Sequence, residues 1–318
     1  MGKDGLENGT MDNSPASTVM WLTASPMSMP LRFGYSSKRI VLALCLPVMD
    51  ASDLRLGTGN GNMVQISAAS HSKTNGEILA QIEREIIAPR TVLDIGCGKG
   101  ALLAQIADMY RARDWPIDPN LLGVDIDISG FVPRDIPHRQ MDLNRPLPFD
   151  DGTIDIVLAV EVLEHTRAPY LVIEEAKRIL RPGGLLIFSV PNVGHALSRM
   201  SFLLNGHFHL YPTPSSDPAK GGTLAGHIEP LPAQYWHYGL RYAGFSDIEV
   251  RTDKSKRGAA GIAWPLRPLL ALARDRYSRY MRRYNPDVAK ETEAARSLAN
   301  RWDILTGRTL IFSARRPA

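Results

Sequence analysis

The sequence predicts an α/β protein built on a parallel, doubly wound sheet. Short apolar runs alternate with helical patterns from about residue 75 onward, as is typical of parallel strands joined by crossover helices. One strand runs through the glycine turn Asp94-Ile-Gly-Cys-Gly-Lys-Gly100 directly into a helical pattern at 101–109. The run at 154–160 is almost entirely apolar, as expected of a strand that is buried on both faces.

Length and composition indicate the number of domains and the cellular compartment. The chain has 318 residues, of which 44% are hydrophobic and 22% charged, enough for one sizeable α/β domain with additions or for two small domains. Its two cysteines, Cys45 and Cys97, are too few for a disulfide framework, so we expect a reducing, cytoplasmic location. No apolar run reaches the roughly 20 residues of a membrane span. The longest, at 40–49, is interrupted by Pro47.

Residues 1–62 differ in composition from the rest of the chain. They are rich in Met, Ser, Gly, Asn and Asp without a hydrophobic period, which predicts a disordered leader or a translation start assigned too early. We expect the main domain to occupy 63–253 and to be completed by a last strand within 307–318.

Seven strands are expected from short apolar runs and extended segments. In chain order they lie at residues 92–93, 121–126, 139–142, 154–160, 185–190, 245–251 and 309–314. Only sixteen residues separate Asp125 from Asp142, which end the second and third strands, and two of them are prolines. The helix that usually joins such strands is therefore expected to be shortened or lost.

Four helices are expected from apolar residues at helical spacing. They lie at residues 77–87, 101–109, 170–180 and 232–243. Pro89 ends the first and Arg181-Pro-Gly-Gly184 ends the third, because proline cannot continue a helix. Two stretches fit neither pattern. The polar stretch 194–229 is expected to form a lid over the site, and 254–306 is expected to be a basic insert, helical after Pro268.

The glycine turn predicts a nucleoside site, because glycine has no Cβ to collide with a ligand and accepts positive φ. Gly96, Gly98 and Ala101 satisfy the G-x-G-x-x-G/A fingerprint of NAD-binding proteins, so an NAD-dependent oxidoreductase is one reading. The glycines also follow G-x-G-x-G, with Asp94 two residues ahead. An acid at that place suits a cationic ligand, such as an amino-acid ammonium, better than a pyrophosphate.

These motifs, together with Asp142-Leu-Asn-Arg-Pro and Leu180-Arg-Pro-Gly-Gly further on, resemble class I S-adenosylmethionine-dependent methyltransferases. The resemblance covers roughly 75–253 and the last strand, and implies a Rossmann-like, seven-stranded sheet with S-adenosylmethionine as cofactor. It implies that Asp125 accepts hydrogen bonds from both ribose hydroxyls. It also implies that Asp142 accepts one from the adenine amino group, with Leu143 against the ring. The residues expected to bind the cofactor are Asp94, Gly96, Gly98, Gly100, Asp125, Ile126, Asp142, Leu143 and Glu161.

A second constellation, Glu161-Val-Leu-Glu164-His165, follows the fourth strand. In a helix its three ionisable side chains would share one face. Similar runs occur in ubiquinone-type O-methyltransferases and small-RNA 2′-O-methyltransferases, where a further histidine helps to hold a divalent ion; His227 has the corresponding place here. The resemblance implies Mg²⁺, Mn²⁺ or Zn²⁺ on Glu161, Glu164, His165 and His227. The other reading is that His165 acts as a general base without a metal.

The acceptor is expected to be an oxygen on a small metabolite, a glycan or a lipid-linked sugar. The stretches 191–195 and 202–208 resemble bacterial methyltransferases of surface-glycan and lipid-linked sugar pathways, and Asn192 is expected to face the acceptor. A non-catalytic module that binds the cofactor and docks through 254–306 is a further reading.

The positive charge of the chain is concentrated in one segment. Residues 251–283 contain ten Lys or Arg against Asp253 and Asp275, a local balance of +8 in a chain of net charge +4. Three readings fit this insert. It could be a solvated helical face, a peripheral contact with anionic lipid through 254–284, or a surface for a nucleic-acid acceptor with tyrosines stacked on bases.

Overall fold

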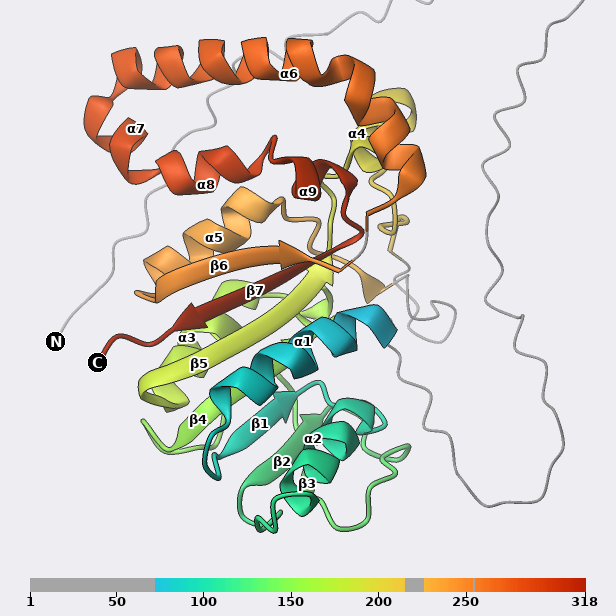
Figure 1. The fold of residues 1–318 in the computed structure, drawn as a ribbon, viewed down its shortest axis with the longest axis vertical. Coiled ribbons are helices and arrows are strands. Elements are labelled where there is room, and N and C mark those ends of the chain that lie inside the picture. Colours follow the sequence, from blue (N-terminus) through green and yellow to red (C-terminus); the bar gives the residue numbers. More distant parts are fainter. Residues whose placement is uncertain (1–71, 215–225, 254) are drawn as a thin grey trace, which may run out of the picture. The chain divides into compact units, whose positions relative to one another are not determined.

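The computed structural model describes residues 72–214, 226–253 and 255–318. The leader expected at 1–62, with Cys45 and the apolar run 40–49, lies outside the described residues. The described chain contains the expected Rossmann-like, seven-stranded sheet, in the order β3-β2-β1-β4-β5-β7-β6 (Figure 1). The strands are β1 Val92–Ile95, β2 Leu121–Asp125, β3 His138–Gln140, β4 Ile154–Val160, β5 Leu180–Pro191, β6 Ser246–Thr252 and β7 Thr309–Arg315.

Helices cover both faces of the sheet, which makes it doubly wound. On one face, α1 (Ser72–Glu85) and α2 (Ala101–Arg111) bury apolar residues against the strands; these include Ile78, Ile82, Leu103 and Ile106. On the other face, α3 (Pro169–Ile179) and α5 (Ala233–Tyr242) bury residues that include Val172, Ala176, Trp236 and Leu240. Figure 1 shows α1 and α2 in front of the sheet and α3 behind it. The four predicted helices are therefore present, with ends shifted by a few residues.

The sheet is mixed, whereas the sequence predicted it to be parallel. β1 to β5 pair in parallel, but β7 lies between β5 and β6 and is antiparallel to both. The chain therefore leaves β6 and enters β7 at the same end of the sheet. That end is the carboxyl end of the parallel strands, where ligands bind in open α/β sheets.

The connection between β2 and β3 contains no helix, as the sequence predicted. Residues 126–137 form turns and bends, and two of their side chains, Phe131 and Pro133, lie close to Gly100 at the start of α2. The loop thereby fills space beside the glycine turn.

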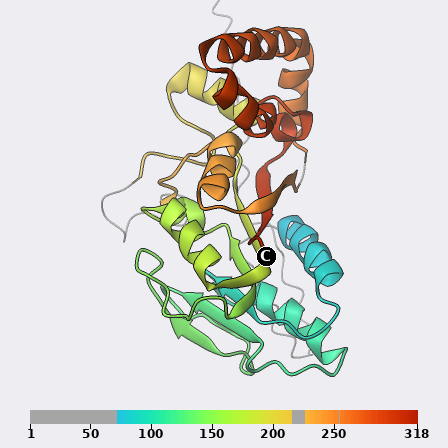
Figure 2. The ribbon, with the colours of Figure 1, turned by 90° about the vertical axis from the view of Figure 1, so that its left-hand side faces the viewer.

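Helices α4 and α6 to α9 lie together at one end of the described structure, and we call them the helical cap (Figures 1 and 2). α4 spans Ala196–Asn205, α6 Arg257–Tyr284, α7 Pro286–Glu291, α8 Glu293–Leu298 and α9 Trp302–Thr306. α4, α6 and α9 meet in a small apolar cluster that contains Ala196, Ala259, Ala263 and Leu305. α6 begins well before Pro268 and contains that proline, so the predicted start of the helix was wrong. Packing of the two buried alanines stabilises the turns that precede the proline.

No helix within the described ranges combines the length and the apolar character needed to cross a bilayer.

Candidate active site

The turn between β1 and α2 is built from three glycines with positive φ. Gly96 has φ 73°, Gly98 φ 52° and Gly100 φ 79°, and Gly100 caps the amino end of α2. A Cβ at Gly96 would collide with the side chain of Val162, and one at Gly100 would lie 2.7 Å from Phe131. At Gly98 a Cβ would meet no heavy atom within 4 Å. The turn therefore contacts neighbouring side chains at Gly96 and Gly100, while the main chain between them, at Gly98, is open.

Asp125 stands at the end of β2, next to this open main chain. Its Oδ2 accepts a hydrogen bond from the Gly98 N–H at 2.8 Å, and its Oδ1 accepts one from the Asp127 N–H at 3.0 Å. A carboxylate oxygen has two lone pairs, so each oxygen can still accept one more hydrogen bond. The side chain is thus held in place with the acceptor capacity that a sugar diol requires.

Asp94 lies beneath the turn on β1 and is almost completely buried. Burial, and then repulsion from Asp125, raise the pKa of its carboxyl to about 8. An uncompensated buried carboxylate is costly, and a nearby cation would stabilise its charged form. The ammonium group of a bound ligand would therefore stabilise the ionised form of the Asp94 carboxyl.

Asp142 and Leu143 lie two and three residues beyond β3, whereas the sequence predicted Asp142 as the last residue of this strand. The Met141 N–H donates to the Asp125 carbonyl at 2.7 Å, which keeps this segment beside the end of β2. Asp142 Oδ1 accepts hydrogen bonds from the main chain and side chain of Asn144, and these hold the pKa of Asp142 below its ordinary value. Ile126, just after Asp125, is 63% exposed, so an apolar surface adjoins the two acids.

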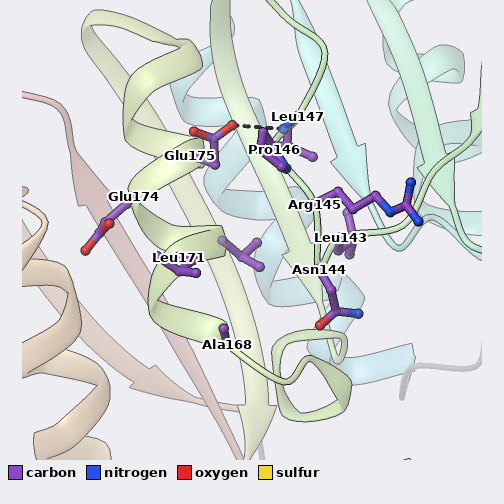
Figure 3. A pocket seen from close by; sticks show the side chains of 10 residues that line it. Leu143, Asn144, Arg145, Pro146, Leu147, Ala168, Leu171, Glu174 and Glu175 are labelled. Carbon is purple, nitrogen blue, oxygen red and sulfur yellow. Dashed lines mark hydrogen bonds between the residues drawn. The ribbon is translucent and has the colours of Figure 1, made fainter. Parts of the chain in front are cut away.

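A pocket of about 180 Å³ opens between α3 and the segment 143–147 (Figure 3). Leu143 and Leu171 are among its apolar lining residues, and the Leu147 N–H donates to Glu175 at 2.9 Å across its rim. Leu143 is the one residue it shares with the predicted cofactor set. The pocket therefore adjoins the predicted adenine end of the site and contains none of the predicted catalytic groups.

The segment after β4 is not an α-helix, so Glu161, Glu164 and His165 do not share a helical face. Glu161 has φ 52°, and only residues Leu163–His165 form one short 3-10 turn. The N–H of Glu161 donates to the carbonyl of Ser189 on β5 at 3.0 Å, and its side chain is hydrogen-bonded to Thr309 on β7. Burial and the charge of Asp253 raise the pKa of Glu161 to about 7.

Three of the four predicted metal ligands come together. One donor atom from each of Glu164, His165 and His227 lies within 4.8 Å of the others. The two imidazole rings are 4.7 Å apart between centroids, and Glu164 Oε1 is 4.0 Å from His227 Nε2. Glu161 is not part of this group. We call Glu164, His165 and His227 the acid–histidine cluster.

Backbone hydrogen bonds bring His227 across from a distant part of the chain. The N–H groups of Ile228 and Glu229 both donate to the carbonyl of Glu164, at 2.9 and 3.2 Å. His227 Nδ1 lies 2.7 Å from the carbonyl of Leu210. That contact requires a proton on Nδ1, which leaves the Nε2 lone pair directed at the cluster.

Glu164 is completely buried, and neither of its carboxylate oxygens has a hydrogen-bond partner among the described residues. Burial, with a contribution from Glu161, raises its pKa well above the ordinary value. Burial also lowers the pKa of His227, so that imidazole is neutral at pH 7. Buried carboxylates without partners are rare and often mark a ligand or ion site.

The structure adds two residues to this site that the sequence analysis missed. Tyr211 is buried beside His227, with ring centroids 5.2 Å apart, and its hydroxyl has no partner among the described residues. A Cβ at Gly226 would lie 2.8 Å from His165 Nδ1, so a side chain at this position would require the ring to shift. Gly226 could have been found from the sequence as the glycine directly before His227, whereas no sequence pattern indicated Tyr211.

Asn192 does not face an acceptor. It is buried, its Nδ2 donates to the carbonyls of Ile304 and Gly307 at 2.7 and 2.9 Å, and its Oδ1 accepts from the Gly194 N–H. With all these groups paired, Asn192 ties β5 to the helical cap. His195, in the predicted lid, is buried, and its Nδ1 accepts from the Ser198 N–H at the start of α4, while its Nε2 has no hydrogen-bond partner among the described residues. The lid residues 215–225 lie outside the described part.

Comparisons with known proteins agree with the predicted family. The family model described as a methyltransferase domain matches residues 68–250. A Mycolicibacterium smegmatis protein named a "probable S-adenosylmethionine-dependent methyltransferase" is 30% identical over 142 residues, 42% of this chain and 51% of its own length. The ubiquinone biosynthesis O-methyltransferase of Paraburkholderia xenovorans is 30% identical over 104 residues, 32% of this chain and 45% of that protein. The matches thus span about half the length of these relatives.

Among solved structures, a methyltransferase from Archaeoglobus fulgidus aligns with a TM-score of 0.45 and 17% identity, over 76% of this chain and 94% of that one.

Proposed function

The chain belongs to the methyltransferase domain family, and we propose that it transfers a methyl group from S-adenosylmethionine to an oxygen acceptor. One observation carries the proposal: Asp125 is fixed beside bare main chain at Gly98, with the buried Asp94 below. This arrangement offers acceptors for a ribose diol, room for a ligand against the backbone and a partner for an ammonium group. An NAD-dependent oxidoreductase would have no use for the third feature.

The cofactor would supply a methyl group that is already activated on a sulfonium, so the protein contributes mainly alignment. Asp125 would hold the ribose, and Asp94 would offset the charge of the amino-acid end. Asp142 and Leu143 would bind the adenine, with the exposed Ile126 beside them. Each role follows from the placement of a carboxylate or an apolar side chain at the carboxyl end of the sheet.

An oxygen acceptor must lose a proton, and the acid–histidine cluster is the group that we propose for this task. Its donor set of one carboxylate and two imidazoles fits Mn²⁺ or Zn²⁺ better than Mg²⁺, which prefers oxygen ligands. Two zinc–ligand bonds of ~2.0–2.2 Å span at most about 4.4 Å, so a single ion can reach both Glu164 Oε1 and His227 Nε2, which are 4.0 Å apart. A divalent ion held by Glu164, His165 and His227 would polarise the acceptor hydroxyl.

The contact between His227 and Leu210 supports the metal reading over a free base. Metal-bound histidines commonly donate their second ring nitrogen to a carbonyl, which fixes the ring and the tautomer. If the cluster holds no ion, His165 is the remaining candidate for the base, because it keeps solvent-exposed surface.

For the acceptor we propose a small metabolite, a glycan or a lipid-linked sugar. One of the matched relatives is named an O-methyltransferase of ubiquinone biosynthesis, which is consistent with an oxygen acceptor. Incubation of a lysate with labelled S-adenosylmethionine and this protein, followed by chromatography, would identify the product that gains label.

Calorimetry with S-adenosylhomocysteine and with NADH tests the class of function. We expect binding of the first and none of the second, and Asp125→Ala should abolish binding while the protein stays folded. Binding of NADH alone would overturn the proposal. Cofactor binding without any methyl transfer across an acceptor panel would instead favour a non-catalytic module.

A further inference from the structure

α6 exposes an apolar stripe to solvent. Leu266, Leu269, Ala273, Tyr277, Tyr280 and Tyr284 follow one another at intervals of three or four residues, which places them on one side of the helix. All six are exposed, with Leu269 at 62% and Tyr284 at 73%. The buried contacts of α6 come from Ala259 and Ala263, near its amino end. The helix thus directs its apolar side away from the protein core.

The neighbouring helix α4 also exposes apolar side chains. α4 packs against α6 and exposes Phe202, Leu203 and Leu204, the last two at 77% and 72%. α4 and α6 together carry ten of the twenty large apolar side chains that are exposed in the described part of the chain. Eight of the ten lie on α4 and on the stripe, whereas Trp264 and Leu272 lie elsewhere around α6. A concentration of exposed apolar side chains of this kind indicates an interaction site.

Arginines flank the stripe on both sides. α6 contains seven arginines and a single acid, Asp275. At 100° per residue, Arg276, Arg279 and Arg283 lie about 60–120° from the centre of the stripe on one side, and Arg267 and Arg274 lie about 100–120° from it on the other. All seven are exposed, and no ion pair between described residues uses any of them. Arg267 lies over the ring of Trp302, 5.0 Å from its centroid, and the charges of the other six arginines are available to a partner.

We propose that the helical cap docks onto the surface of an anionic lipid bilayer through the α6 stripe. An interfacial helix buries its apolar side at the level of the lipid headgroups, while flanking basic side chains reach the phosphates. Tyrosine suits this boundary because its ring is apolar and its hydroxyl is polar. Exposed leucines gain more from the hydrocarbon edge of a bilayer than from the charged sugar–phosphate surface of a nucleic acid, which is why lipid fits this surface better than RNA.

Docking would also place the acceptor side of the protein near the membrane. Helices α6 to α9 of the cap connect β6 to β7 at the carboxyl end of the parallel strands, the same edge that holds Asp125 and the acid–histidine cluster. The proposal concerns binding and does not depend on methyl transfer.

Flotation with vesicles tests the proposal on the full chain. We expect binding to vesicles of equal parts phosphatidylglycerol and phosphatidylcholine, weak binding to pure phosphatidylcholine, and loss of much of the binding in 0.5 M salt, because basic residues act through the surface potential. The double variants Leu269→Glu/Tyr280→Glu and Arg276→Glu/Arg283→Glu should each lower the partition coefficient about tenfold or more.

Matched controls separate the cap from general charge and hydrophobicity. Ile87→Glu removes an 84% exposed apolar side chain outside the cap, and Arg84→Glu/Arg241→Glu reverses two exposed charges on α1 and α5. Both should bind vesicles like the unaltered protein, and all variants should keep its circular dichroism and its affinity for S-adenosylhomocysteine. No binding to anionic vesicles, or equal loss in the controls, would overturn the proposal. Tight binding of a single-stranded oligoribonucleotide without vesicle binding would assign the surface to nucleic acid instead.

Discussion

Glu164 Oε1 lies 4.0 Å from His227 Nε2, and neither Glu164 oxygen has a hydrogen-bond partner among the described residues. The separation is too long for a hydrogen bond. A fully buried carboxylate in this state opposes folding, because its charged form has lost water without gaining a partner. Two of the predictions below follow from this relationship.

Glu164→Gln should stabilise the metal-free protein at pH 8. The pKa of Glu164 is higher in the folded than in the unfolded protein. Its protonation therefore contributes fully to the free energy of unfolding below the ordinary pKa of 4.5, and this contribution is lost as the pH rises toward the folded-state pKa. The neutral amide avoids that loss. We expect the melting temperature to rise at pH 8 by about 2–4 °C per kcal/mol gained, and to change less at pH 5.

Differential scanning fluorimetry in EDTA measures this effect. Glu77→Gln, an exposed acid on α1, serves as control and should leave the melting temperature unchanged at both pH values. A Glu164→Gln variant that melts lower at pH 8 would show that the carboxylate has a stabilising partner within the protein.

Removal of metal should abolish methyl transfer. Dialysis against EDTA is expected to lower activity to background, and Mn²⁺ or Zn²⁺ to restore it. His227→Ala should lose bound metal when measured by elemental analysis, because it removes one of three ligands. His237→Ala, at a half-buried histidine on α5, should retain the metal. Full turnover in EDTA would leave His165 as the base.

Two glycine variants should have different effects. The Cβ of alanine at position 98 would meet no heavy atom within 4 Å, so Gly98→Ala should cost only about 1 kcal/mol of stability, for its positive φ. The same Cβ should weaken binding of S-adenosylhomocysteine at least tenfold, because it would occupy space expected for the ligand. Gly96→Ala should destabilise the fold more, because its Cβ would collide with Val162. Thermal melts and calorimetry of both variants provide the comparison. Unchanged ligand affinity in folded Gly98→Ala would contradict the placement of the ligand.

Affinity for S-adenosylhomocysteine should rise with pH between 6 and 8. The pKa of Asp94 is about 8 in the free protein, and an ammonium group favours its ionised form. Over this interval the ionised fraction grows by more than about tenfold, and the association constant should follow. Calorimetry at pH 6, 7 and 8 measures the slope. Asp94→Asn should bind weakly with no slope, and an equal slope in that variant would assign the titration to another group.

The sequence predicted the parts of this protein that depend on local patterns. The glycine turn, the acid at the end of β2 and the missing helix before β3 are all determined by neighbouring residues, and all are present. The candidate metal ligands were predicted from a resemblance, but the helical face inferred for them was wrong, because Glu161 takes a left-handed conformation and its side chain bonds to Thr309. That contact joins residues far apart in the chain, and periodicity carries no information about it.

The direction of β7 and the role of Asn192 were missed for the same reason. An apolar run predicts a strand but not its direction, which depends on where the preceding connection returns. Asn192 follows a strand end, a common place for ligand contacts, yet its partners Ile304 and Gly307 are more than one hundred residues away. A buried amide that cross-links two segments looks the same in sequence as one that binds a substrate.

The position of β7 between β5 and β6 has a consequence for biosynthesis. β5 and β6 are adjacent to β7 but not to each other, so the sheet stays split until residues 309–315 have left the ribosome. Nascent chains that have reached the helical cap but not Thr309 present open strand edges, together with the leucines and tyrosines of α4 and α6. Translation of this protein therefore passes through a stage that is prone to aggregation and suited to capture by chaperones.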